Sequence, residues 1–137
     1  MYPLNRNRRL RSKESLRNLV RESSIHPHDF IAPVFVIEGS NLKEEISSMP
    51  GYFRYSLDNL KKEIKELWSI GVQAILLFVK VPDSLKDNLG SEAINEQGLM
   101  QRAIKEIKNL VPEITIMTDV ALDPYSNYGH DGIVKGM

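Results

Sequence analysis

The segment Ala74-Ile75-Leu76-Leu77-Phe78-Val79 is apolar at every position and rich in residues that favour strands. A strand that exposes one face to water alternates apolar with polar residues, whereas an unbroken apolar run is typical of a strand buried on both faces. Strands of that kind occur in parallel sheets covered by helices. We therefore expect an α/β protein built around a parallel sheet.

Two further segments of the same kind lie on either side of this one. Residues 31–37 form the first expected strand, in which Pro33 removes one ladder hydrogen bond. A loop that contains the turn sequence Pro50-Gly51 follows it. Residues 114–120 form the third expected strand.

Amphipathic helices are expected between these strands. One begins after Ser56, a residue that can cap it, and ends at Gly71. The other runs from residue 99 to residue 111 and ends at Pro112. Both place apolar residues at three- and four-residue spacing, so each can cover the sheet with one face.

The spacing of the strands indicates a fold larger than this chain. Their centres fall near residues 35, 76 and 116, so each strand-plus-helix unit takes about 40 residues. Such units close into a barrel at eight, or form an open doubly wound sheet at five or six. Eight units would need roughly 320 residues, and this chain has 137. The sequence is therefore expected to be the first part of a larger α/β fold, either a barrel or an open sheet.

The overall composition bounds the class of protein. The chain has 18 basic and 18 acidic residues, 42% hydrophobic residues and no cysteine. This apolar fraction is too high for a disordered chain, and no apolar run approaches the ~20 residues of a membrane span. The lack of cysteine excludes a disulfide scaffold and thiolate metal sites. We expect a cytoplasmic protein.

Positive charge is concentrated at the amino end. Residues 1–22 carry seven basic and two acidic residues, and the rest of the chain carries 11 basic and 16 acidic ones. A basic arm on an acidic body can contact another subunit, remain a solvated tail, or bind nucleic acid. The arm has only one aromatic residue, Tyr2, whereas single-strand binders use several. Apolar residues in the arm indicate a short helix that also buries one face: Leu10, Leu16, Leu19 and Val20.

Polar side chains gather after the third expected strand. In barrels and open sheets, reactive groups collect at the carboxyl ends of strands. Here the sequence has Asp119, Asp123, Asp131, Ser126 and His130. Such groups can bind a hard cation or share protons, although Asp-Pro and Asp-Gly are also ordinary turn sequences. We take the three aspartates as candidate catalytic residues, with the serine and the histidine in support.

Lys80, at the end of the middle strand, has two interpretations. A buried lysine that has lost its proton can form a Schiff base. The more ordinary interpretation is a charged residue at the point where a strand leaves the sheet. The sequence contains no phosphate-binding loop and no dinucleotide fingerprint that would suggest another chemistry.

Several motifs resemble those of a known enzyme family, in the same order along the chain. The most specific is Thr118-Asp119-Val120-Ala121-Leu122-Asp123-Pro124-Tyr125, followed by Gly129-His130-Asp131-Gly132. The others are Arg8-Arg9-Leu10-Arg11, Pro33-Val34-Phe35-Val36-Ile37-Glu38-Gly39, Ser48-Met49-Pro50-Gly51, Lys86-Asp87 and Gly90-Ser91-Glu92-Ala93. Over essentially its whole length the sequence is similar to porphobilinogen synthase, also called delta-aminolevulinic acid dehydratase.

This resemblance implies an activity, a fold and an assembly. The family condenses two 5-aminolevulinate molecules to porphobilinogen with loss of water, in the tetrapyrrole pathway to heme and chlorophyll. Its fold is an eightfold β/α barrel, so residues 29–137 are expected to be the first three β/α units, the N-terminal part, of an incomplete (β/α)8 TIM barrel. Its N-terminal arm, extended or helical and here expected at residues 1–28, wraps a neighbouring subunit, usually in a homo-octamer. The resemblance thus implies a lyase that acts on 5-aminolevulinate, with Arg8, Arg9 and Arg11 in the assembly arm. It implies no nucleic-acid or membrane partner.

The resemblance also has consequences for metals. Zinc-dependent members carry three cysteines at positions that resemble Ala121, Asp123 and Asp131 here. Carboxylates in place of thiolates favour a hard cation over zinc. We expect no catalytic zinc, and magnesium as an allosteric ion bound at a site outside this chain. Asp123 and Asp131 can instead orient substrate ammonium groups or pass protons.

The amine nucleophiles of the family are missing from this sequence. Two lysines in later barrel strands form Schiff bases with the substrates in the family, and none of the ten lysines here matches them. We therefore expect the isolated chain to be inactive, either as a fragment of an active enzyme or as a truncated product. Two alternatives are a non-catalytic assembly partner of intact subunits and a nucleic-acid binder that uses the basic arm.

Overall fold

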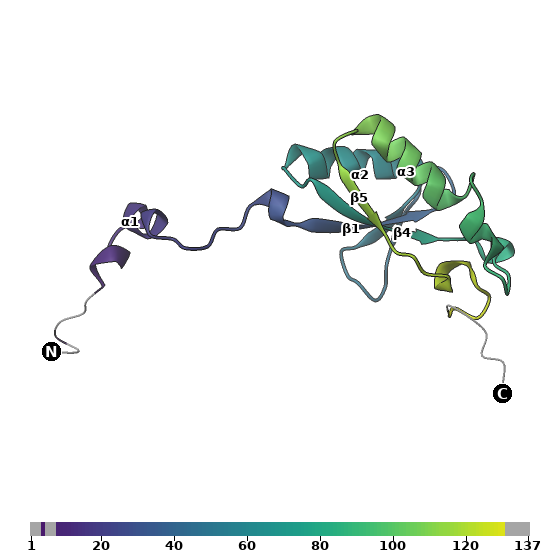
Figure 1. Cartoon of the computed structure of the whole chain (residues 1–137), viewed down its shortest axis with the longest axis horizontal. Helices are drawn as coiled ribbons and strands as arrows, with labels where there is room; N and C mark the ends of the chain where they lie inside the picture. Colours follow the sequence, from purple (N-terminus) through teal and green to yellow (C-terminus); the bar gives the residue numbers. More distant parts are fainter. Residues whose placement is uncertain (1–3, 5–7, 131–137) are drawn as a thin grey trace.

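Two long helices cover one face of a sheet in the computed structural model, which describes residue 4 and residues 8–130 (Figure 1). The strands expected from the sequence are present as β1 (Ile31–Ile37), β4 (Ala74–Lys80) and β5 (Thr115–Thr118). They are parallel and adjacent in that order. The expectation of an α/β fold with a parallel sheet is therefore confirmed.

The third strand is shorter than the sequence indicates. It ends at Thr118, so Asp119 and Val120 lie beyond it. Among the described residues β5 forms one edge of the sheet, and only β4 supplies it with ladder hydrogen bonds. Because β5 has no second neighbouring strand in the described residues, the apolar Val120 does not pair in the sheet and is 98% exposed.

The two helices are α2 (Leu57–Ser69) and α3 (Leu99–Leu110), as the periodicity predicts. They pack on the face of the sheet that alternate residues of β1 and β4 present to them. The buried core between these layers includes Val34, Val36, Leu60, Ile64, Ile75, Leu77, Ala103 and Ile107. No helix in the described part of the chain combines the length and the apolar character needed to cross a bilayer.

Ser56 lies at the N-cap position of α2, but its side chain does not cap the helix. The hydroxyl instead accepts a hydrogen bond from the Leu42 N–H at 2.9 Å and donates one to the Asp58 carboxylate at 2.5 Å. Ser56 is fully buried, because the loop at Leu42 covers it. The boundary of the helix was predicted correctly from Ser56, whereas its capping role was not.

A short hairpin occupies most of the segment that was expected to be a loop. It consists of β2 (Lys43–Glu45) and β3 (Phe53–Tyr55), which are antiparallel and are joined through the predicted turn at Pro50-Gly51. Strand β3 also pairs in parallel with the carboxyl-terminal half of β1, so the sheet order is β2-β3-β1-β4-β5. Strands of three residues are too short to produce a detectable period in the sequence.

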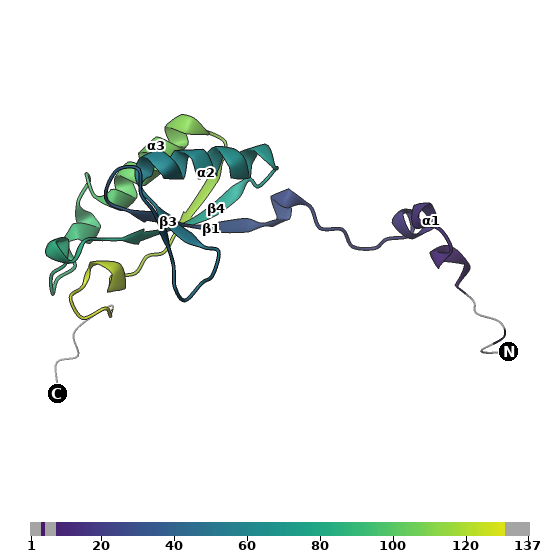
Figure 2. The same ribbon diagram turned by 180° about the vertical axis from the view of Figure 1, so that it is seen from behind.

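The amino-terminal segment extends away from the sheet (Figure 1, Figure 2). Its described part contains a 3-10 turn at Arg9–Arg11, helix α1 (Glu14–Leu19) and a second 3-10 turn at Pro27–Asp29. The predicted short helix is therefore present, but none of its residues is buried. Among the described residues Leu19 is 81% exposed, and burial of the apolar face of this helix against another subunit stays a prediction.

Candidate active site

A cleft of about 300 Å³ lies at the carboxyl ends of β1 and β4. The two strands, the hairpin, the loop after β4 and the segment after β5 all contribute residues to it. Six lining residues define its chemistry: Phe35, Phe78, Arg54, Lys80, Lys86 and Asp123. The cleft therefore has an aromatic wall, three cationic side chains and one carboxylate, at the edge of the sheet where α/β enzymes place their reactive groups.

The aromatic wall is a stacked pair. Phe35 and Phe78 are opposite one another in the β1–β4 register, and their ring centroids are 5.1 Å apart with planes within 16°. Their neighbours Val34 and Leu77 face the helices and are buried. Because successive side chains of a strand point to opposite faces, the two rings lie on the face of the sheet without helices.

Two of the cations share one acid. Glu44 of β2 accepts a hydrogen bond from Arg54 at 2.8 Å and one from Lys80 at 3.3 Å. Lys80 and then Arg54 lower the pKa of the Glu44 carboxyl. The hairpin is thus tied to the end of β4, and the Lys80 side chain remains 56% exposed. An ion-paired and exposed ammonium group lacks the burial that a Schiff-base lysine needs, which favours the ordinary interpretation of Lys80.

The third cation, Lys86, is held by an acid of its own loop. Its ammonium group is 2.8 Å from the Asp83 carboxylate, and this hydrogen bond lowers the pKa of Asp83. The Lys86 side chain is 24% exposed, whereas that of Asp83 is 94% exposed. Lys86 therefore lines the cleft while its ammonium group pairs with a carboxylate in solvent.

Asp123 is the predicted site residue that the structure brings into the cleft. It begins the 3-10 turn Asp123–Tyr125, which follows β5. A carboxylate in this position can bind an ammonium group or accept a proton, and the cations around it can bind a carboxylate. The cleft is thus complementary to a small molecule that carries both charges.

The other predicted residues do not join Asp123 in the cleft. Asp119 follows β5 directly and is exposed, outside the set of lining residues. Ser126 is buried, and its hydroxyl accepts a hydrogen bond from the Tyr128 N–H at 3.1 Å, so it shapes the loop. His130 is exposed at the end of the described residues, and Asp131 lies outside them.

Sequence reasoning missed Phe35, Phe78 and Arg54 as residues of the site. The two phenylalanines could have been identified from the alternation of faces along β1 and β4, because the residues next to them in each strand pack against the helices. Arg54 lies on the unexpected strand β3, and no pattern in the sequence places that strand beside the cleft.

A second cleft, of about 290 Å³, lies beside the first and shares Lys80 with it. Glu38, which directly follows β1, lines this cleft and forms an ion pair with Arg102 of α3. The same Arg102 donates a hydrogen bond to the Gln97 carbonyl at 2.9 Å. These contacts fix the start of α3 against the carboxyl end of β1.

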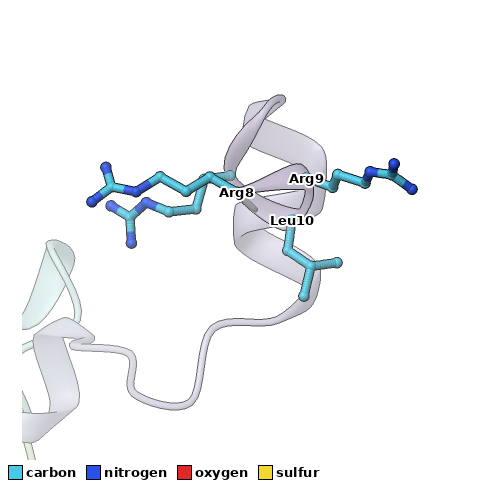
Figure 3. Close-up of a pocket in the computed structure, with 4 residues that line it drawn as sticks. Arg8, Arg9 and Leu10 are labelled. Atoms are coloured by element: carbon cyan, nitrogen blue, oxygen red, sulfur yellow. The ribbon is translucent and has the colours of Figure 1, made fainter. Parts of the chain in front are cut away.

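The arm carries a separate hollow of about 400 Å³ (Figure 3). It is lined by Leu10 and by Arg8, Arg9 and Arg11, the three residues for which the resemblance implies a place in an assembly arm. Figure 3 shows Arg8 and Arg9 extending in opposite directions from the turn, and Leu10 is 58% exposed. This combination of cations and an apolar side chain is complementary to an acidic surface with an apolar centre.

Nowhere in residues 8–130 do three His, Asp or Glu side chains come together in a way that could hold an ion. Ala121, at one of the positions that resemble zinc ligands, has no ligating atom in its side chain. The donors in this part of the chain therefore do not fit a zinc site of the thiolate type.

Comparison with known proteins identifies relatives for nearly the whole chain. The family model described as "Delta-aminolevulinic acid dehydratase" matches residues 4–137. The chain is 48% identical over 128 residues to the delta-aminolevulinic acid dehydratase of Chlamydia pneumoniae, covering 93% of this chain and 39% of the relative. It is 43% identical over 131 residues to that of Bacillus subtilis, covering 96% and 40%. The chain thus spans about 40% of the length of the curated relatives it matches.

A solved structure shares the fold. The chain superposes with a TM-score of 0.86 and 43% identity on the crystal structure of Toxoplasma gondii delta-aminolevulinic acid dehydratase in complex with the reaction product porphobilinogen. The match covers 96% of this chain and 37% of that one. It corresponds to the N-terminal part of a TIM barrel, as the family resemblance implies.

Proposed function

The chain belongs to the delta-aminolevulinic acid dehydratase family, and we propose that it forms part of an enzyme that condenses two 5-aminolevulinate molecules to porphobilinogen with loss of water. Such an enzyme is a lyase of the tetrapyrrole pathway. The observation that carries this proposal is the position of Asp123, which lines a charged cleft at the strand ends within a family match over residues 4–137.

The chemistry of the cleft is compatible with the substrate. 5-Aminolevulinate has an ammonium group at one end, a carboxylate at the other and a ketone between them. Asp123 can bind the ammonium group, and Arg54 and Lys86 can bind the carboxylate. The rings of Phe35 and Phe78 form an apolar wall that shields the carbon chain from water.

We assign roles to the predicted site residues accordingly. Asp119, Asp123 and Asp131 orient the substrate ammonium groups or move protons during ring formation. Ser126 supports them by holding the loop through Tyr128, and His130 is a second supporting residue. None of the ten lysines here matches the family's Schiff-base lysines. We therefore propose that lysines in the later strands of the barrel form the Schiff bases with the two ketones.

The metal of this enzyme is proposed to be magnesium rather than zinc. Ala121, Asp123 and Asp131 replace a thiolate set, and carboxylate oxygens favour the harder ion. We place magnesium in an allosteric role outside these residues. Zinc has no catalytic part in this proposal.

Residues 1–28 are proposed to be an assembly arm in a cytoplasmic homo-octamer. Exposed Leu10 and Leu19 beside Arg8, Arg9 and Arg11 support this role, because apolar side chains on a projecting segment are stabilised by a partner subunit. The same exposed arm supports a second candidate function, in which the chain acts as a non-catalytic assembly partner of intact subunits.

The test uses a chimera, in which this chain replaces the matching segment of the Chlamydia pneumoniae relative. Porphobilinogen formation is measured for the chimera and for its Asp123→Ala variant. Loss of a group that orients substrate or moves a proton should lower kcat by about 100-fold or more. Glu113→Ala is the matched control, since this exposed acid lies at the amino end of β5, away from the cleft.

The outcomes test the role of Asp123 and the catalytic function of the chain separately. An active chimera that tolerates Asp123→Ala would remove Asp123 from the site. A chimera that assembles but makes no porphobilinogen would favour the non-catalytic assembly partner. Size-exclusion chromatography of every variant establishes whether assembly is intact.

A further inference from the structure

The loop between β4 and α3 contacts the segment that carries Asp123. The backbone N–H of Asp87 donates to the Tyr125 carbonyl at 3.3 Å, and the Asp87 carbonyl accepts from the Asn127 N–H at 3.4 Å. These two bonds lie on either side of Ser126 and form a single bridge of parallel type. Asp87 is thus joined by its main chain to the turn that begins at Asp123.

The Asp87 side chain shapes its own turn. One carboxylate oxygen accepts hydrogen bonds from the backbone N–H groups of Leu89 and Ser91, at 2.9 and 3.0 Å. These bonds, that of Ser91 first, lower the pKa of Asp87. Gly90 lies between the two donors with a φ of +65°, a left-handed conformation that other residues rarely adopt. The carboxylate and the glycine together fix the path of residues 87–91.

This turn fits closely against the Asp123 segment. A Cβ atom added at Gly90 would lie 3.2 Å from Leu122 Cδ2 and 3.8 Å from Tyr125 Cβ. Gly90 and Tyr125 are both buried, and burial raises the pKa of the Tyr125 hydroxyl. A change in the path of residues 87–91 would therefore push directly on the residues before and after Asp123.

We propose that Asp87 is a positioning residue of the candidate site, whose carboxylate fixes the 87–91 turn and thereby holds Asp123 towards the cleft. The effect on catalysis rests on the proposed function, whereas the structural coupling does not. The role also gives a reason for Lys86-Asp87 and Gly90-Ser91 to occur together. This one turn places Lys86 in the cleft and holds the segment that carries Asp123, which lines the same cleft.

Amide hydrogen exchange of the 137-residue chain, followed by NMR, tests the coupling. Asp87→Ala should speed exchange at Leu89 and Ser91, and also by about tenfold at Asn127, Tyr128 and Gly129. Asp87→Asn should stay close to the parent chain, because an amide oxygen can accept the same two bonds. Glu96→Ala, an exposed acid in the same loop, is the control.

The proposal is overturned if Asp87→Ala speeds amide exchange at Leu89 and Ser91 while exchange at residues 127–129 is unchanged. If Asp87→Ala also speeds amide exchange in β4 and α2, Gly90→Ala is measured in its place. The Gly90→Ala variant keeps the Asp87 carboxylate but displaces the turn. Faster exchange at residues 127–129 in Gly90→Ala supports the coupling, and unchanged exchange there refutes it.

The chimera tests the catalytic consequence. Asp87→Ala should lower kcat about tenfold with KM within about threefold, because misplacing Asp123 affects bound substrate. Asp87→Asn should restore kcat, which a general loss of stability would not predict. Equal kcat in the two variants and the parent would show that the turn does not position the site. If the parent chimera is itself inactive, the proposed function fails, and the exchange result still decides the coupling.

Discussion

Phe35 stacks on Phe78 across the β1–β4 ladder, with ring centroids 5.1 Å apart, on the face of the sheet opposite α2 and α3. The residue before each ring points the other way and is buried against the helices. One pair of strands therefore supplies the core with aliphatic side chains and the cleft with aromatic ones. The two faces should respond differently to truncation.

Adjacent residues on β4 test this difference. Leu77→Ala should lower the free energy of unfolding by about 3 kcal/mol, because Leu77 is fully buried and truncation leaves a cavity. Phe78→Ala should cost only about 1 kcal/mol, since one side of the ring already faces the cleft. Urea unfolding of both variants measures the two values. Equal losses would mean that the helix-free face is as well packed as the core.

The end of α2 provides a test of backbone strain. Gly71 has a φ of +93°, and an added Cβ would lie 3.2 Å from Pro27 Cβ, so Gly71→Ala should cost about 2 kcal/mol from strain and crowding together. Gly51→Ala is the matched variant, because Gly51 has a φ of +82° with no atom within 4 Å of the added Cβ. It should cost about 1 kcal/mol, from strain alone. Thermal unfolding compares the two, and a larger loss at Gly51 would contradict the role of Pro27.

The stability of the chain should fall in alkaline solution because of Tyr55. Burial, and then a hydrogen bond to Glu63, raise the pKa of Tyr55 to about 12. A folded-state pKa above the unfolded value of about 10 means that its contribution is complete below pH 10 and is lost as the pH rises towards 12. Tyr55→Phe should flatten this loss in urea midpoints between pH 9 and pH 12. Tyr52→Phe, at a more exposed tyrosine, is the matched control.

Metal removal should distinguish magnesium from zinc in the chimera. A zinc-selective chelator should leave porphobilinogen formation unaffected, because the thiolate positions resemble Ala121, Asp123 and Asp131 here. A general chelator should reduce it, and added magnesium should restore it. Restoration by zinc but not by magnesium would refute the proposed metal.

Most of the sheet and both long helices could be predicted because their signals are local. The apolar run at 74–79 and the spacing of apolar residues in α2 and α3 are properties of short windows of sequence. Strands β2 and β3 escaped prediction because their contacts exist only in the folded chain. Strand β3 pairs with β1, and β2 is held by pairing with β3 and by the Glu44 ion pairs.

The site also contains residues that could be predicted from local sequence and residues that could not. Asp123 could be predicted from a motif that follows a strand, and the structure brings it into the cleft. The stacking of Phe35 on Phe78 depends on strand register, and the placement of Arg54 depends on the hairpin. The capping of α2 by Ser56 was wrong because a distant backbone group, the Leu42 N–H, binds the hydroxyl instead.

The hairpin beside β1 has a consequence for how the sheet is built around that strand. Its pairing joins Glu45 to Phe53, a short chain closure, whereas β1–β4 pairing joins Ile31 to Ala74 across a whole helix. Strand β3 occupies one side of β1 at Phe35 and Val36, and β4 pairs along the other side from Ile31 to Ile37. The short local connection and the long helical crossover thus use opposite sides of one strand.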